Sequence, residues 1–198
     1  MEGKEQALIF VYLRNMKPIT EHRKFESIDA YLAFEEKSEV RHEYYLENLI
    51  EMSGTTYKHN DLVFYLSAFF RFNLPKSKFK ISSEQVKLYI ANENIFFYPD
   101  VMVALPEEQQ YYSTQPVLIT EVLSESTRKF DMIDKFIQYQ KLDTLQYYIL
   151  VEPEKQLVIV HKKTPETGWQ TDTYTSITDV IDLPTLQISL VLKDIYQA

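Results

Sequence analysis

The sequence predicts an α/β fold in which a mixed central β-sheet is covered by helices. Two observations carry this prediction: short apolar segments typical of strands recur along the chain, and segments with helical apolar periodicity lie between them. The 198 residues suit one domain, and no Pro/Gly/Ser-rich linker divides them. We therefore expect residues 1–26 to form an N-terminal leader segment and residues 27–198 to form a single domain.

Composition narrows the function classes. The chain has no cysteine, which excludes disulfides and thiolate metal sites. The apolar stretch Ala7–Leu13 is too short to span a membrane, so we expect a cytoplasmic protein. The net charge of −8 argues against a broad phosphate-binding face. It leaves three readings: transient contact with nucleic acid, a local basic patch, or cations that neutralise clustered carboxylates.

The first half of the chain supplies two helices and a hairpin. Ser27 is a good N-cap for a helix over Ile28–Lys37. A hairpin follows, with strands Val40–Tyr45 and Asn48–Met52 around Leu46–Glu47. The next helix, Lys58–Leu74, ends at a proline. Its predicted apolar stripe consists of Leu62, Phe64, Tyr65, Leu66, Ala68, Phe69 and Phe72.

The second half supplies most of the strands. The predicted strands are Phe79–Ala91, Ile95–Ala104, Val117–Leu123, Tyr147–Val151 and Leu157–His161, with two β-like segments at Asp179–Leu183 and Leu186–Leu192. A polar loop is expected over Gln109–Gln115. N-cap candidates in Ser124–Thr127 begin a helix that runs to about Leu142. We expect Phe130, Ile133, Phe136 and Ile137 to supply most of its apolar side.

Two carboxylates stand out against their apolar surroundings. Glu121 interrupts an apolar strand, where a charge is costly unless it is paired or bound to a metal. The alternative is a glutamate in water at an open strand end or paired with a lysine. Asp100 follows Pro99 inside a strand pattern, and proline there favours an edge or a bulge. Such an aspartate either faces a cleft or bonds local backbone N–H groups.

The helix after Glu121 adds a possible third element. Asp131, Lys135 and Tyr139 follow one another at intervals of four residues, so they share one helix face. Taken alone, this spacing favours an ordinary surface ion pair. His59, near the start of a helix, is interpreted as a capping or packing residue in preference to a catalytic one.

The combination of these features resembles a known family. Its motifs are Ser83-Glu84-Gln85-Val86, Tyr98-Pro99-Asp100-Val101, the run from Pro116 to Thr127, Asp131, Lys135, Tyr139 and Tyr147–Val151, with Arg41–Tyr44, Met52–Gly54 and His59 upstream. Over about residues 27–160, the chain is similar to the PD-(D/E)XK nuclease superfamily, and more closely to its Uma2-like branch of putative restriction endonucleases.

The resemblance implies a restriction-endonuclease-like fold and a Mg²⁺ or Mn²⁺ site. Asp100 and Glu121 would be the metal carboxylates, the carbonyl of Val122 a third ligand, and Glu43 a further metal or water ligand. The superfamily places its lysine two residues after the glutamate, where this chain has Leu123. In Uma2-like relatives the lysine comes from the next helix, where Lys135 matches and Lys129 is the fallback.

Two function classes follow from these features. The first is a metal-dependent endonuclease that hydrolyses phosphodiester bonds of DNA, with Asp100, Glu121 and Lys135 at its centre and a homodimer as its expected assembly. RNA and branched DNA stay open as substrates, because no base-reading element is evident. The second is a non-catalytic interaction module on the same fold, which the acidic charge and the missing strand lysine favour.

Overall fold

The structure is a computed structural model that describes residues 19–166 and 168–197. Its contacts divide the chain into two units, 1–54 with 89–97 and 55–88 with 98–198, each of which is considered by itself. Most of the predicted leader lies outside the described residues, and the single-domain organisation stays a prediction. The longest described helix has 17 residues, and none of the described helices carries a segment that could span a lipid bilayer.

The smaller unit is a short antiparallel sheet with one helix. Its elements are β1 (Ile19–His22), α2 (Ile28–Lys37), β2 (His42–Tyr45), β3 (Asn48–Glu51) and β6 (Ile95–Phe97), and its strand order is β1-β3-β2-β6. The predicted hairpin is confirmed: Tyr45 pairs with Asn48, and Leu46 and Glu47 both have positive φ, as a two-residue type I′ turn requires. The N-cap of α2 is also confirmed, because the Ser27 hydroxyl accepts the Ala30 N–H at 3.1 Å.

The larger unit contains a six-stranded mixed sheet. Its strands are β4 (Lys80–Ser82), β7 (Val101–Ala104), β9 (Pro116–Val122), β10 (Tyr147–Val151), β11 (Val158–Thr164) and β12 (Gly168–Tyr174), in the order β12-β11-β10-β9-β7-β4. Only the β9–β10 pair is parallel in this sheet; the other neighbours are antiparallel. This is the mixed α/β architecture that the sequence predicts.

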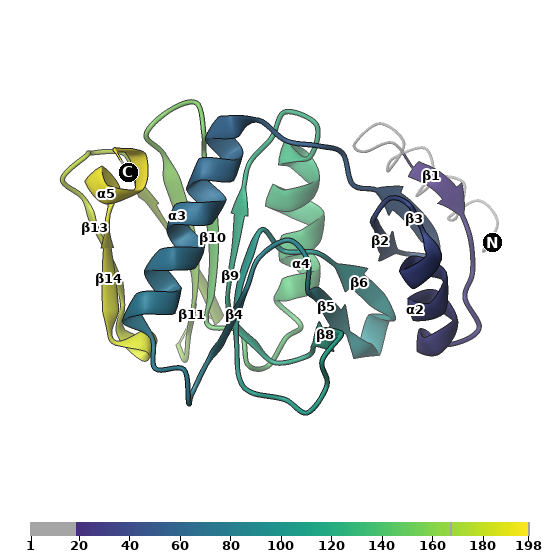
Figure 1. The fold of residues 1–198 in the computed structure, drawn as a ribbon. Helices are drawn as coiled ribbons and strands as arrows, with labels where there is room; N and C mark the ends of the chain where they lie inside the picture. Colours follow the sequence, from purple (N-terminus) through teal and green to yellow (C-terminus); the bar gives the residue numbers. More distant parts are fainter. Residues whose placement is uncertain (1–18, 167, 198) are drawn as a thin grey trace. The chain divides into compact units, whose positions relative to one another are not determined.

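Helices cover both faces of this sheet (Figure 1). α3 (Tyr57–Asn73) lies on one face, and α4 (Phe136–Tyr139), preceded by a π-helix at Phe130–Lys135, lies on the other. Side chains of β9 alternate accordingly: Leu118 and Val122 join the core beneath α3, whereas Glu121 contacts the α4 side. A second hairpin and a short helix complete the unit: β13 (Val180–Leu183), β14 (Ile188–Val191) and α5 (Leu192–Tyr196).

Two predicted strands are each broken in the structure. The segment Phe79–Ala91 forms β4 and β5 (Lys87–Ile90), separated by a bend in which Glu84 has φ 49°. The segment Ile95–Ala104 forms β6 and β7, separated at Tyr98-Pro99-Asp100. Apolar residues stand on both sides of each break, so each segment was expected to form one strand. Part of the predicted loop, Tyr112–Ser113, forms a short strand β8 beside β5.

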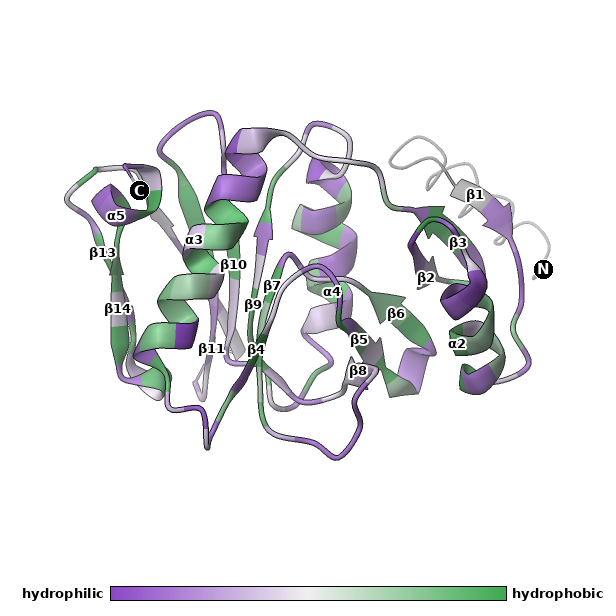
Figure 2. Cartoon of the chain, viewed as in Figure 1, coloured by the Kyte–Doolittle hydropathy of each residue, from purple (hydrophilic) through white to green (hydrophobic). Residues whose placement is uncertain are grey.

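The apolar stripe predicted for α3 is partly wrong. The face that packs into the core consists of Leu62, Val63, Leu66 and Phe70. Phe64 and Phe72 are instead exposed, with 75% and 86% of their surface accessible. Apolar residues occupy both the inward and the outward faces of this helix, and Figure 2 shows green segments along the side in view, so the sequence alone did not define the inward face.

His161 makes the stability of the larger unit depend on pH. Its ring stacks on Phe136 at 3.9 Å between centroids, and burial lowers its pKa to about 4. Because the unfolded imidazole titrates near 6.5, stability is full above that pH and falls as the pH drops towards 4, by up to about 3 kcal/mol. Urea denaturation between pH 4 and 7 should therefore show a steeper decline for the wild type than for His161→Gln. Parallel pH profiles would contradict this assignment.

Candidate metal centre

Asp100 lies at the break between β6 and β7, immediately before β7 begins. Its Oδ2 accepts the Val122 N–H at 2.7 Å, so the carboxylate is fixed against the end of β9. Its own N–H donates to Glu121 Oε2 at 3.2 Å. The two carboxylates predicted from the sequence are therefore brought together, although 20 residues lie between them in the chain. The antiparallel pairing of β7 with β9, in which Val101 faces Thr120, produces this meeting.

Glu121 is held by hydrogen-bond donors inside the protein. The residue is 2% exposed and sits on β9. Its Oε1 accepts from Lys135 Nζ at 2.9 Å and from the Tyr139 hydroxyl at 3.0 Å, while Oε2 accepts the Asp100 N–H. These hydrogen bonds offset the free-energy cost of burying the charge and fix the orientation of the carboxylate.

Lys135 links two carboxylates across the sheet face. Its ammonium lies 2.9 Å from Glu121 and 3.1 Å from Asp131, and all three residues are buried. The structure thus makes the Asp131–Lys135 pair an interior ion pair and not a surface one. The Tyr148 hydroxyl donates to the Asp131 carbonyl at 2.8 Å. Burial, followed by the charges of Glu121 and Asp131, raises the pKa of Tyr148, so this phenol stays protonated as a donor.

The apolar side predicted for this helix is partly wrong. Phe130 is buried, but Ile133 and Ile137 are 42% and 50% exposed, and Asp134 and Gln138 take inward positions. The inward residues Asp131, Asp134, Lys135, Gln138 and Tyr139 repeat at intervals of three and four and so form one face, and the segment begins with the π-helix Phe130–Lys135. A π-helical turn within an α-helix is frequently found at functional sites.

The Val122 carbonyl is directed towards Asp100. The N–H and C=O groups of one strand residue point to the same neighbouring strand, and the Val122 N–H already donates to Asp100. The opposite edge of β9 is occupied by β10, where the Leu123 N–H donates to the Val151 carbonyl at 2.8 Å. A backbone oxygen therefore faces the same place as the Asp100 carboxylate.

Two further residues join Asp100 that the sequence analysis did not assign to the centre. His59 and Glu84 each offer one ligand atom, and these atoms and one of Asp100 all lie within 4.8 Å of one another. His59 Nε2 is 3.2 Å from Asp100 Oδ2. The Glu84 N–H donates to the Pro99 carbonyl at 3.0 Å, which ties the left-handed bend at Glu84 to the segment that carries Asp100.

Signals for both residues exist in the sequence, but they are weak. His59 also has the capping-region position predicted for it, because its N–H donates to Thr56 Oγ1 at the start of α3. That local contact gave no sign of the distant aspartate. Glu84 stands within one of the family-like motifs, and its strained φ could not be inferred from its residue type.

Carboxylates outnumber cations in this region. Burial alone would lower the pKa of His59, but its hydrogen bond to Asp100 and the charges of Asp100, Glu84 and Glu121 outweigh that effect and raise it. Four carboxylates, from Asp100, Glu121, Glu84 and Asp131, therefore lie near one lysine and one histidine. An excess of oxygen donors with negative charge suits a divalent cation.

The remaining predicted site residues are placed as follows. Glu43 is buried on β2 in the smaller unit, and its part in the centre stays a prediction. Lys129, the fallback lysine, is exposed, whereas Lys135 contacts Glu121. Leu123 is buried directly after β9 and offers no charged group.

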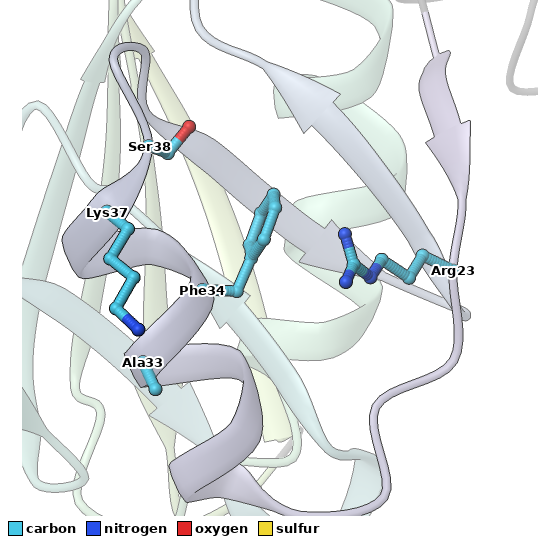
Figure 3. Close-up of a pocket in the computed structure, with 5 residues that line it drawn as sticks. All are labelled: Arg23, Ala33, Phe34, Lys37 and Ser38. Carbon is cyan, nitrogen blue, oxygen red and sulfur yellow. The ribbon is translucent and has the colours of Figure 1, made fainter.

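A separate hollow of about 360 Å³ lies in the smaller unit (Figure 3). Its lining residues are Arg23, Ala33, Phe34, Lys37 and Ser38. The Arg23 guanidinium lies over the Phe34 ring, 4.6 Å from the centroid. The lining holds two cations and no carboxylate or imidazole.

Comparisons with known proteins identify the family of this chain. Residues 28–193 match the model of the family Uma2, described as "Putative restriction endonuclease". The chain is 33% identical over 144 residues to "Uncharacterized protein sll1609" of Synechocystis sp. (strain ATCC 27184 / PCC 6803 / Kazusa), covering 70% of this chain and 81% of that protein. It is 29% identical over 174 residues to "Uncharacterized protein slr1290" of the same organism, covering 86% of this chain and 91% of the relative.

A solved structure has the same fold. The crystal structure of "a putative nuclease belonging to DUF820" from Anabaena variabilis ATCC 29413 aligns with a TM-score of 0.70 at 18% identity, covering 85% of this chain and 96% of that one. The predicted fold class is thereby confirmed, and family and fold together support a nuclease. With a family model matched over most of its length, the chain belongs to the Uma2 family.

Proposed function

We propose that this protein is a metal-dependent endonuclease that hydrolyses phosphodiester bonds of DNA. The observation that carries the proposal is the meeting of Asp100 and Glu121 at adjacent strand ends, with the Lys135 ammonium 2.9 Å from Glu121. The proposed ion is Mg²⁺ or Mn²⁺, and the proposed ligands are Asp100, Glu121 and the Val122 carbonyl. These are oxygen donors, which both ions accept.

The donor set fits such an ion. Asp100 presents its carboxylate beside the Val122 backbone, and Glu84 and His59 offer further ligand atoms within 4.8 Å of it. The local excess of negative charge needs a counter-charge that Lys135 and His59 supply only in part. A bound divalent ion would polarise the scissile phosphate and lower the pKa of a water molecule.

The protein's own residues then have distinct tasks. Lys135, positioned by Glu121 and Asp131, would orient the attacking water or stabilise the negative charge that develops on the phosphate. Tyr139 and the Asp100 N–H keep the Glu121 carboxylate in one orientation. His59, whose Nε2 lies 3.2 Å from Asp100 Oδ2, would be a further ligand of the ion.

Calorimetry and cleavage assays test the proposal together. We expect binding of Mn²⁺ or Mg²⁺ at millimolar concentration or below, and nicking of supercoiled plasmid that stops when EDTA is added. Metal binding without cleavage of DNA, RNA or branched DNA would favour the non-catalytic module, which Leu123 at the usual lysine position supports. Absence of metal binding at millimolar concentration would overturn the proposal.

The imidazole of His59 should distinguish the two ions. Mn²⁺ accepts nitrogen ligands more readily than Mg²⁺, which strongly prefers oxygen. We therefore expect His59→Gln to weaken Mn²⁺ binding by about tenfold or more while changing Mg²⁺ binding less. Calorimetric titration with each ion measures both effects, and His22→Gln, on β1 of the smaller unit, is the matched control. Equal losses for the two ions would contradict a role of the imidazole as a ligand.

We also propose a homodimer, because two symmetric copies would present two centres to the two strands of a duplex. The cytoplasmic location stays a prediction.

A further inference from the structure

The outer face of α3 carries an aromatic stripe that the core does not use. Tyr57, Phe64 and Phe72 are 90%, 75% and 86% exposed. These three residues and Asp61, Ala68 and Arg71 lie on one side of the helix, because successive members are three or four residues apart and the last two are neighbours. This strip, the α3 outer face, lies opposite the core-facing residues Leu62, Leu66 and Phe70. Large aromatic side chains gathered on one exposed face mark an interaction surface.

The sequence of this face is complementary to itself in an antiparallel arrangement. We consider a twofold axis that passes the helix at the level of Leu66. Such an axis brings a residue that precedes Leu66 by a given number of positions opposite the residue of the other copy that follows Leu66 by the same number. Asp61 and Arg71 are five residues before and after, so each acid would face the base of the other copy. Phe64 and Ala68 are two residues before and after, so each large ring would face a small side chain. Opposite charges and matched sizes therefore occur twice in one contact.

A parallel arrangement of the same two faces would be unfavourable. It would bring each residue against its own copy, so Asp61 would face Asp61 and Arg71 would face Arg71. Like charges placed opposite each other at an interface disfavour that pairing. Nucleic acid is a poor occupant as well, because the face contains an aspartate and the chain carries a net charge of −8.

We propose that a second copy of this chain docks on the α3 outer face, with the two α3 helices antiparallel around Leu66. The contact is isologous, so one surface serves both subunits. This contact would be the interface of the proposed homodimer, and its formation does not depend on metal binding or on cleavage. Failure of either proposal can therefore be recognised separately.

Charge reversal tests the pairing. Sedimentation velocity over about 1 to 100 µM should find a wild-type dimer whose Kd rises at least about tenfold in Asp61→Arg and in Arg71→Asp. The double variant Asp61→Arg/Arg71→Asp restores opposite charges across the axis and should return the Kd to within a few-fold of wild type. Glu108→Arg, an exposed acid of the same unit outside the α3 outer face, is the matched control and should leave the Kd unchanged.

The aromatic contribution is tested by Phe64→Ser. The side chain is exposed, so circular dichroism and the thermal midpoint should stay close to wild type while the dimer dissociates. A wild-type monomer at all concentrations would overturn the proposal. So would a dimer unaffected by Phe64→Ser, or a double variant as weak as its two single variants.

Discussion

Replacing Asp100 by Asn is expected to abolish metal-dependent cleavage while leaving the fold intact. Asparagine has nearly the same volume, and its amide oxygen can still accept the Val122 N–H that Asp100 Oδ2 accepts at 2.7 Å. The negative charge at the proposed metal ligand is lost, however, and the imidazole of His59 loses its ionic partner. We expect cleavage to fall by about 10²-fold or more, as is typical when one electrostatic stabiliser is removed from an active site.

The rate of plasmid nicking and the metal affinity measured by calorimetry should both fall in this variant. Metal binding should weaken in parallel with cleavage, and the urea denaturation midpoint should stay near the wild-type value. Asp172→Asn is the matched control, since that residue pairs with Lys162 on the surface of β11 and β12. Cleavage at the wild-type rate by the Asp100 variant would reject this residue as a ligand.

Replacing Lys135 by Met is expected to have the largest effect on stability. The ammonium is buried between Glu121 and Asp131, so its removal leaves two buried carboxylates without their cation. Loss of one partner from a buried ion pair costs about 3 to 5 kcal/mol. Methionine fills a similar volume, so the loss reflects charge more than packing. Urea denaturation measures the free energy of unfolding directly.

A second substitution separates the structural from the catalytic role of Lys135. Adding Glu121→Gln to Lys135→Met removes one of the two uncompensated charges, so part of the lost stability should return, whereas cleavage should stay absent. Lys162→Met removes a partly exposed ion pair instead and should cost less than about 1 kcal/mol. The assignment fails if Lys135→Met unfolds at the same urea concentration as the wild type.

The local features of the fold could be predicted from the sequence. Ser27 predicted the start of α2, Pro75 predicted the end of α3, and the apolar run around Leu118 predicted the buried strand β9. These signals could be read because caps, helix breakers and apolar runs depend on residues that are neighbours in the sequence. Pro99 indicated an edge or a bulge but not the end of a strand, and the break at Glu84 was missed although the polar residues 82–85 interrupt the apolar alternation. Left-handed backbone at a glutamate is set by tertiary contacts, here the Glu84 N–H bonded to the Pro99 carbonyl.

The candidate centre was predictable in part. A charge on an apolar strand singled out Glu121 within one element. Lys135 was assigned through the resemblance to Uma2-like proteins, because its four-residue spacing alone favours a surface ion pair. The contact of His59 with Asp100 joins α3 to the start of β7, and no spacing in the sequence encodes it. The interior position of Asp134 and Gln138 was missed because the apolar residues Ile133 and Ile137 favoured another face of this helix.

The helical segment after β9 makes the number of residues there as important as their identity. An α-helix advances by about 100° per residue, and Lys135 and Tyr139 both reach Glu121 because they lie four residues apart. Deleting one solvent-facing residue such as Met132 would rotate every later side chain of the helix by about 100° relative to β9, although the residues that contact Glu121 would be unchanged. Insertions and deletions in this segment should therefore be selected against more strongly than amino-acid exchanges on its outer side.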